Sequence, residues 1–533
     1  MSTISSVFIV NHTTCSDPCP HILYVISVHR DDGSQYEVLR RYSEFVTLRE
    51  KLNAPFSLPP KRNLVSVVLP YKWIDDGLIN ERKRGLQLFL TLLIYDTKPR
   101  QHPDLLHFLD ASDLDYQESM IWPPLSEMAS KESLISVKTT VRAPDTPPRP
   151  VAGSYYPSWA SDTIPISKID FSKFDILFFA FVTPNGTAGI NWDEGSQETL
   201  KKLVSGARNS GQGTKIVLSV GGWSGSHWYS QAMSTERNRS KLVKILAETV
   251  ESYSLDGIDI DWEYPNAPGA GNPHSSADAG NLLDFFKMLR NTLGSSKIIS
   301  AAVTHLPWLG ENGQPLNNVA EYAKYMTYVN VMNYDVFGPS AHPGPNAPLD
   351  AGNLCGSSSQ PQETAQAALA QWKSAGMPAS KILLGLPLYG YVCKSSDKRL
   401  SGSSIPSSIF QHGAHPKFAN QLPHTSAPLG DLSALWGQQI SFSQLVRSGA
   451  LVKKSDGTYI GANGYTMGWD NCSDTPYLFN TSRTTVVTYD DTYSIASKTA
   501  FAKQSGMGGC FTWSLDQDDE LALHNVILQN LVR

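Results

Sequence analysis

A short run of acids alternating with apolar residues is the part of this chain best suited to chemistry. It extends from Asp256 to Glu263 with the sequence DGIDIDWE. Successive side chains on a β-strand point to opposite faces, so Asp259, Asp261 and Glu263 share one face, and the isoleucines and the tryptophan share the other. Acids this close cannot all ionise freely, so at least one pKa should rise. This cost favours a functional acid–base site with Glu263 at the end of the strand, whereas Asp256, on the apolar face, is interpreted as structural.

Two other interpretations of this run are weaker. A solvated acidic loop does not explain the strict alternation with apolar residues. Three carboxylates can hold Mg²⁺ or Ca²⁺, but no His or Asn within the run completes such a site. We therefore expect neither a metal nor a cofactor.

Eight β-rich runs after residue 150 alternate with helix-like stretches. They cover residues 151–156, 174–182, 215–220, 257–262, 298–303, 328–334, 382–388 and 508–513. Several are apolar on both faces, as the strands of a parallel sheet must be. We predict an α/β fold, a (β/α)8 TIM barrel over 151–533, with the acids at the C-terminal face where the active sites of such barrels lie. The stretch from about 391 to 485 lacks such a unit and predicts an insertion domain between strands seven and eight.

The first 112 residues predict a separate domain. Residues 22–30 and 35–40 alternate like two strands around a turn at 31–34, residues 42–51 are helix-like, and 75–95 has apolar residues at helical spacing. These elements predict a small α+β domain over 1–112. Residues 113–150 are polar and end in a Pro-rich segment, so we expect them to form a linker.

The acid run resembles the D-x-x-D-x-D-x-E signature of glycoside hydrolase family 18, the chitinases and their relatives. Further segments agree with this family, each at the end of a predicted strand. They are 219–223 (SVGGW), 332–335 (MNYD), 513–516 (WSLD) and the aromatic pair Tyr155 and Trp159. The resemblance covers about 151–533 and implies hydrolysis of chitin.

This family uses substrate assistance, in which the 2-acetamido oxygen of the sugar attacks the anomeric carbon. The resemblance implies that Glu263 protonates the glycosidic oxygen and then activates water. It also implies that Asp261 holds the acetamido N–H, that Asp259 shares a proton with Asp261, and that Tyr334 donates to the acetamido carbonyl oxygen. The substrate-binding residues that it implies are Tyr155, Trp159, Trp223, Met332, Asp335, Tyr389 and Trp513.

Two positions depart from the pattern of the family. Many relatives carry an Arg two residues after the strand-seven tyrosine, where this chain has Tyr391. Many also have a Met two residues before the strand-eight tryptophan, where this chain has Phe511. We expect both side chains to line the pocket and to alter its subsite preferences.

A second resemblance lies in the N-terminal domain. The segments 40–45 (RRYSEF), 58–61 (LPPK) and 81–90 (ERKRGLQLFL) resemble three ordered motifs of PX (phox homology) domains, which bind phosphoinositides. The resemblance covers about 5–112. It implies that Arg41 grips the 3-phosphate, Tyr42 packs under the inositol ring, Lys61 contacts the 1-phosphate and Arg82 the ring hydroxyls. The expected ligand is phosphatidylinositol 3-phosphate in a membrane, and a solvated basic face is the alternative.

Composition adds few constraints. A formal net charge of −5 gives no global attraction to nucleic acid, and we expect a monomer whose partners are chitin or its oligosaccharides and a phosphoinositide membrane. The first residues lack the basic and apolar regions of a signal peptide, which indicates a cytosolic or endosomal location. The relatives of the barrel are usually secreted. A tethered intracellular chitinase, unconventional export and an erroneous joining of the two segments all stay open. The six cysteines fit buried thiols or one or two disulfides.

The leading prediction is an endo-acting, retaining chitinase fused to a phosphoinositide-binding module. The alternatives are an endo-β-N-acetylglucosaminidase acting on N-glycans, a chitin-binding lectin, and a membrane-trafficking protein whose barrel is secondary. Such lectins typically lose the acid, which this chain retains as Glu263. The insertion favours a deep groove for a linear polymer over an N-glycan site.

Overall fold

The structure of the chain is a computed structural model. It describes residues 4–15, 21–32, 34–52, 58, 83, 85–87, 89–91, 93–94, 102–110, 149–349, 363–400, 428–470 and 473–532. The chain divides into two compact units, Met1–Val141 and Arg142–Arg533.

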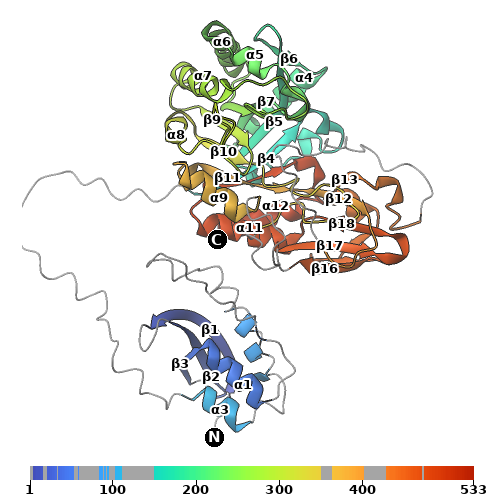
Figure 1. Cartoon of the computed structure of the whole chain (residues 1–533). Helices are drawn as coiled ribbons and strands as arrows, with labels where there is room; N and C mark the ends of the chain where they lie inside the picture. Colours follow the sequence, from blue (N-terminus) through green and yellow to red (C-terminus); the bar gives the residue numbers. More distant parts are fainter. Residues whose placement is uncertain are drawn as a thin grey trace, which may run out of the picture. The chain divides into compact units, whose positions relative to one another are not determined.

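The second unit is built on a closed barrel of eight parallel strands, which confirms the predicted fold (Figure 1). The strands are β4 (Val151–Pro157), β5 (Ile176–Pro184), β7 (Lys215–Gly221), β8 (Gly257–Asp261), β9 (Ile298–Val303), β10 (Tyr328–Val331), β11 (Ile382–Pro387) and β19 (Gly509–Trp513). They pair in the order in which they follow in the chain, and β4 closes the barrel by pairing with both β5 and β19. A short strand, β6 (Ile190–Trp192), pairs antiparallel with β5.

Strand β5 shows why these strands are apolar on both faces. Leu177 and Phe179 belong to the large buried cluster that the barrel forms with its helices. Ile176, Phe178 and Ala180 belong to a separate buried cluster inside the barrel. Both faces of the strand therefore exclude water, as the sequence pattern predicts.

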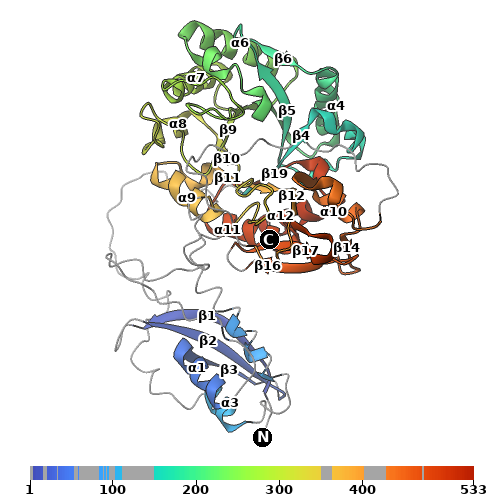
Figure 2. The same ribbon diagram turned by 45° about the vertical axis from the view of Figure 1, so that its right-hand side comes forward.

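Helices cover the outside of the barrel (Figures 1 and 2). They are α4 (Ser196–Ser210), α5 (Tyr229–Met233), α6 (Glu236–Ser252), α7 (Asp278–Leu293), α8 (Ala320–Tyr325), α9 (Ala365–Ser374), α11 (Thr492–Gln504) and α12 (Ala522–Val532). Polar residues fix several helix starts. Thr235, Thr364 and Asp491 each accept a hydrogen bond from a backbone N–H in the first turn of α6, α9 and α11.

The insertion forms its own antiparallel sheet between β11 and β19. Its strands are β12 (Tyr389–Lys394), β13 (Gln438–Ser441), β16 (Thr466–Asp470), β17 (Thr475–Asn480) and β18 (Thr485–Thr488), paired in the order β13-β12-β18-β17-β16. The helix α10 (Phe442–Arg447) and a hairpin of β14 (Leu451–Lys453) and β15 (Tyr459–Gly461) complete it. Because β12 begins two residues after β11 ends, the new sheet starts directly at the rim of the barrel.

The first unit contains a three-stranded antiparallel sheet of β1 (Ile4–Cys15), β2 (His21–Arg30) and β3 (Gln35–Arg41), with helices α1 (Tyr42–Lys51) and α3 (Pro103–Phe108). The described residues between 83 and 94 are helical, in agreement with the predicted helix. Strand β1 was not predicted. Tyr24, Phe45 and Phe89 belong to the small core that joins sheet and helices, so the predicted α+β architecture is confirmed.

The cysteines whose side chains are described are free. Cys393 and Cys510 are buried thiols, and burial raises their pKa values to about 11 and about 12.

Candidate active site

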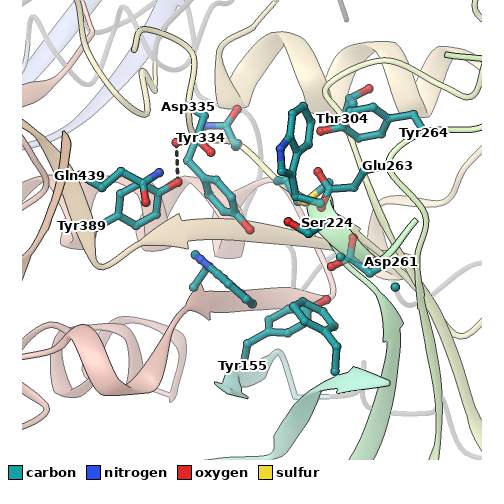
Figure 3. A pocket seen from close by; sticks show the side chains of 18 of the residues that line it. Tyr155, Ser224, Asp261, Glu263, Tyr264, Thr304, Tyr334, Asp335, Tyr389 and Gln439 are labelled. Carbon is teal, nitrogen blue, oxygen red and sulfur yellow. Dashed lines mark hydrogen bonds between the residues drawn. The ribbon is translucent and has the colours of Figure 1, made fainter. Parts of the chain in front are cut away.

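A cavity of about 530 Å³ lies at the C-terminal ends of the barrel strands (Figure 3). Most of the side chains predicted for substrate contact line it. They are Tyr155, Trp159, Trp223, Asp261, Glu263, Met332, Tyr334, Asp335, Tyr389 and Trp513. Asp259 is not among the lining residues and is fully buried inside the barrel.

Strand β8 presents its acids as the alternation predicts, but it is shorter than predicted. Ile258, Ile260 and Trp262 lie in the cluster shared with the helices, whereas Asp261 and Glu263 line the cavity. The strand ends at Asp261, so the expectation that Glu263 ends it was wrong. The Glu263 N–H leaves the strand pairing because it donates to the Ser226 hydroxyl at 2.9 Å.

Asp259 is held by four neutral donors. The hydroxyls of Tyr155 (2.8 Å), Ser219 (2.7 Å) and Ser300 (2.7 Å) and the amide of Asn330 (3.2 Å) donate to its carboxylate. Burial raises the pKa of Asp259, and the three hydroxyl bonds oppose that rise because they favour the ionised form. Both oxygens of Asp259 are thus occupied by donors. The proton shared with Asp261, which the family resemblance implies, stays a prediction.

Asp261 differs from Asp259 in its hydrogen bonding. Its Oδ1 atom is buried and has no hydrogen-bond partner among the residues that the structure describes, although the residue lines the cavity. Burial raises the pKa of Asp261 well above its ordinary value, and the charges of Glu263 and Asp259 raise it further. This carboxylate therefore has acceptor capacity for a donor that a ligand brings into the cavity.

The backbone around the acids is fixed by close packing of β7 against β8. The Gly222 N–H donates to the Asp261 carbonyl at 2.8 Å, and a side chain at Gly221 (φ +109°) would collide with that same carbonyl. The Ser226 hydroxyl accepts from Glu263 and donates to the Gly222 carbonyl at 2.9 Å. The two glycines of the sequence SVGGW therefore allow the end of β7 to pack closely against the backbone of Asp261.

Tyr334 is a protonated hydroxyl facing the cavity. Burial raises its pKa well above the ordinary value, and the nearby carboxylates, with Asp261 first, raise it further. A tyrosine of this kind keeps its proton at any physiological pH and serves as a hydrogen-bond donor.

Aromatic rings form one wall of the cavity. Trp513, at the end of β19, stacks on Phe181 with ring centroids 5.6 Å apart and meets Tyr155 edge-on at 5.4 Å. Trp159 is 48% exposed and lies 6.4 Å from Phe181. Trp223 lies 6.5 Å from Tyr264. Such rings suit the apolar faces of sugars.

Asp335 is anchored by two tyrosines. The Tyr389 hydroxyl donates to its Oδ1 atom at 2.6 Å (Figure 3). The Tyr391 hydroxyl donates to the same atom at 2.6 Å, and Gln439 donates to the Tyr391 hydroxyl at 3.0 Å. The expectation that Tyr391 and Phe511 line the cavity was wrong. Tyr391 lies behind Asp335 because β12 turns into the insertion sheet, and Phe511 is fully buried in the cluster inside the barrel.

Several lining residues were not predicted. Among them are Phe181, Asp193, His305, Glu363 and Gln439. Phe181 and His305 lie at or just beyond the ends of strands, so their position in the chain was an available signal. Asp193, Glu363 and Gln439 lie outside the barrel strands, and no local pattern marks them.

Asp256 lies at the other end of β8 in a structural ion pair. Its Oδ2 atom lies 2.7 Å from the Arg208 guanidinium and accepts the Ile216 N–H at 2.8 Å. This agrees with its interpretation as structural.

In the first unit, strand alternation separates two neighbouring arginines. Arg40 is buried and donates to the carbonyls of Phe108 (2.8 Å) and Asp110 (3.1 Å), whereas Arg41 is exposed. Tyr42 is half-buried against the small core. Lys61 and Arg82, the other predicted lipid contacts, lie outside the described residues.

Comparison with known proteins gives the same division of the chain. The family model "Glycosyl hydrolases family 18" matches residues 152–518, and the PX domain model matches residues 29–112. A chitinase-like effector of Moniliophthora roreri is 33% identical over 382 residues, which is 69% of this chain and 89% of that protein. Chitinase A1 of Niallia circulans is 26% identical over 440 residues, 71% of this chain and 58% of that protein. The crystal structure of a chitinase from Rhizomucor miehei has 30% identity and a TM-score of 0.59, covering 72% of this chain and 100% of that chain.

The barrel and its row of inward acids define a glycoside hydrolase fold. The chain belongs to glycosyl hydrolase family 18, and a PX domain precedes the barrel.

Within the described residues, no cluster of three or more His, Cys, Asp or Glu side chains is arranged to hold a metal ion. No helix in the described part of the chain is long and apolar enough to cross a membrane.

Proposed function

We propose that the barrel is an endo-acting chitinase that hydrolyses β-1,4 bonds between N-acetylglucosamine units by the retaining, substrate-assisted route. The observation that carries this proposal is the unpartnered Asp261 Oδ1 atom beside Glu263 in one aromatic-walled cavity. An acetamido N–H is the donor that such an oxygen lacks.

We infer the following roles, which the positions of these side chains in the cavity support. Asp261 binds the acetamido N–H and stabilises the positive charge that develops when the acetamido oxygen attacks the anomeric carbon. Tyr334 donates to the acetamido group, and Glu263 protonates the departing glycosidic oxygen before it activates water. Asp259, held by four donors behind Asp261, acts on the substrate only through its influence on the pKa of Asp261. No enzyme carboxylate becomes covalent in this scheme.

The test uses chitin oligosaccharides and the anomeric form of the products. The whole chain is expected to release β-anomers from internal bonds, and Glu263→Gln is expected to lower the rate at least 10²-fold, since a positioned acid contributes roughly 10²–10⁴-fold. Two relatives are called chitinase-like effectors, so the experiment decides whether this chain has chitinase activity. A wild-type chain without products, or an equally active variant, would overturn the proposal. Release of N-glycans from a glycoprotein instead of chitin fragments would favour the endo-β-N-acetylglucosaminidase.

We also propose that the PX domain binds phosphatidylinositol 3-phosphate. The family match to residues 29–112 and the exposed guanidinium of Arg41 support this, because a guanidinium pairs with phosphate in bidentate fashion. Vesicles with and without this lipid test it by co-sedimentation of the whole chain. Arg41→Gln should abolish the difference between the vesicles, whereas Arg49→Gln, the same charge change on the exposed last turn of α1, should keep it.

A further inference from the structure

We propose that His305 and Glu363 form a subsite for the unacetylated 2-amino group of a leaving sugar, so that the barrel favours partially deacetylated chitin. This inference rests on the proposed function for the direction in which the substrate lies. It concerns a pair of cavity residues to which the proposed mechanism gives no role.

The first observation is a carboxylate on a buried residue that accepts no hydrogen bond from any described residue. Glu363 is 5% exposed and lines the cavity, and His305, 6% exposed, lines it beside Glu363. Their closest approach, His305 Nε2 to Glu363 Oε1, is 3.8 Å, which is beyond hydrogen-bond distance. Among the described residues, no donor reaches the Glu363 carboxylate, so both of its oxygens retain acceptor capacity.

The second observation is that the pair is held in place. Glu363 directly precedes Thr364, whose side chain accepts the Ala367 N–H at the start of α9. From the same helix, Gln371 donates to the His305 carbonyl at 2.9 Å and Trp372 donates to the Thr304 carbonyl at 3.0 Å. Helix α9 therefore fixes the backbone at Glu363 and the loop that carries the histidine, so both side chains start from rigid elements.

The third observation is the charge of the cavity. Five carboxylates line it, those of Asp193, Asp261, Glu263, Asp335 and Glu363, and no Lys or Arg is among its described lining residues. The Asp335 carboxylate accepts hydrogen bonds from the neutral hydroxyls of Tyr389 and Tyr391. A cavity of this charge attracts a cation. In a chitin chain, the only group that becomes cationic is a 2-amino group without its acetyl substituent.

The position of the pair identifies the sugar concerned. Glu263 protonates the bond between the sugar held by Asp261 and the leaving sugar, so these two sugars lie on opposite sides of Glu263. In Figure 3, Thr304 lies on the side of Glu263 away from Asp261 and Tyr155. His305, the next residue of the same loop, also lines the cavity, and we infer that it faces the leaving sugar. Burial raises the pKa of Glu363 to about 7, and an ammonium group beside it would favour the ionised form.

Binding measured without turnover tests the subsite. On a Glu263→Gln background, calorimetry compares a tetrasaccharide of N-acetylglucosamine with tetrasaccharides in which the third or the fourth unit from the non-reducing end is glucosamine. We expect one of the glucosamine-containing ligands to bind at least tenfold more tightly than the fully acetylated one. Adding Glu363→Gln should remove that preference, and adding Glu311→Gln, the same change at an exposed position outside the cavity, should keep it.

The outcomes separate the two proposals. Equal affinity for all three ligands on the Glu263→Gln background overturns the subsite, whether or not the Glu363 variant folds. A preference that survives Glu363→Gln also overturns it. If the wild-type chain fails to cleave the acetylated tetrasaccharide but the preference is present, the hydrolase proposal fails and the subsite stands.

Discussion

The carboxylates of the cavity region fall into two groups that differ in their hydrogen bonding. Asp259 receives four donors, and Asp335 receives two tyrosine hydroxyls on one oxygen. Asp261 Oδ1 is a buried atom, and Glu363 is a residue with 5% exposure; both line the cavity and accept no hydrogen bond from the described residues. Burying a carboxylate oxygen without a donor is costly. The comparison therefore distinguishes acids that support the site from acids that act on a ligand.

The largest effect on activity is expected at Asp261, whose Oδ1 atom accepts no hydrogen bond from the described residues. Asp261→Asn keeps the shape of the side chain but removes the charge that opposes the developing positive charge on the substrate. We expect kcat to fall about 10²–10³-fold, the range seen when one preorganised electrostatic group is lost. Steady-state kinetics on a chitin oligosaccharide measures this. If KM rose while kcat stayed the same, Asp261 would be a binding residue only.

The second effect concerns stability and pH at Glu363. Burial raises its pKa from 4.5 to about 7. Between these values the folded chain keeps a proton that the unfolded chain has lost, so this stability contribution is complete below pH 4.5 and disappears as the pH rises through 7. Relative to Glu363→Gln, which lacks this titration, wild type should lose about 3 kcal/mol of unfolding free energy between pH 4 and pH 8.

Urea unfolding of both chains at pH 4, 6 and 8 checks this difference. A constant difference between wild type and Glu363→Gln would mean that folding does not shift the pKa of Glu363. The distinction between the two groups of acids would then not hold at this residue.

The positions of the acids and aromatic residues on the barrel strands can be predicted from the sequence, because they depend only on residues close together in the chain. Strand parity places Asp259, Asp261 and Glu263, and the ends of the strands place Trp223, Tyr334 and Trp513, since parallel strands of a barrel end at one face. Glu363 joins the cavity only because Gln371 and Trp372 hold α9 against the loop after β9. No pattern near residue 363 encodes that contact.

Tyr391, which departs from the pattern of the family, shows the same dependence on contacts between distant parts of the chain. The spacing from Tyr389 suggested that Tyr391 lines the pocket, but the residue belongs to β12, where it pairs with Gln439 of the insertion sheet. Its environment is set by a strand that lies about 48 residues further along the chain. Predicting it requires the register of that sheet, which a single sequence does not supply.

A third effect is expected where a supporting acid loses one donor. Ser300→Ala removes one of the hydrogen bonds to Asp259 and leaves three. The bond stabilises the ionised form, so its loss should raise the pKa of Asp259 further and lower the unfolding free energy by about 1–2 kcal/mol. Ser154→Ala is the matched control, because Ser154 is equally buried in the barrel and bonds only neutral groups. A smaller loss is expected there, and equal losses would show that the charge of Asp259 is not what these serines stabilise.

The smallest effect is expected at Tyr391, which supports Asp335 without lining the cavity. Tyr391→Phe keeps the ring and removes one of the two hydroxyls on Asp335 Oδ1, while Tyr389 retains its own bond at 2.6 Å and Asn346 still accepts the Asp335 N–H at 2.9 Å. The loss of about 1 kcal/mol in positioning corresponds to roughly a fivefold rise in KM with little change in kcat. Tyr389→Phe removes a bond of the same length at a residue that also lines the cavity, so it should cost more. If Tyr391→Phe had the larger effect, Tyr391 would act by a route other than Asp335, and Asp335 would not belong with Asp259 among the supported acids.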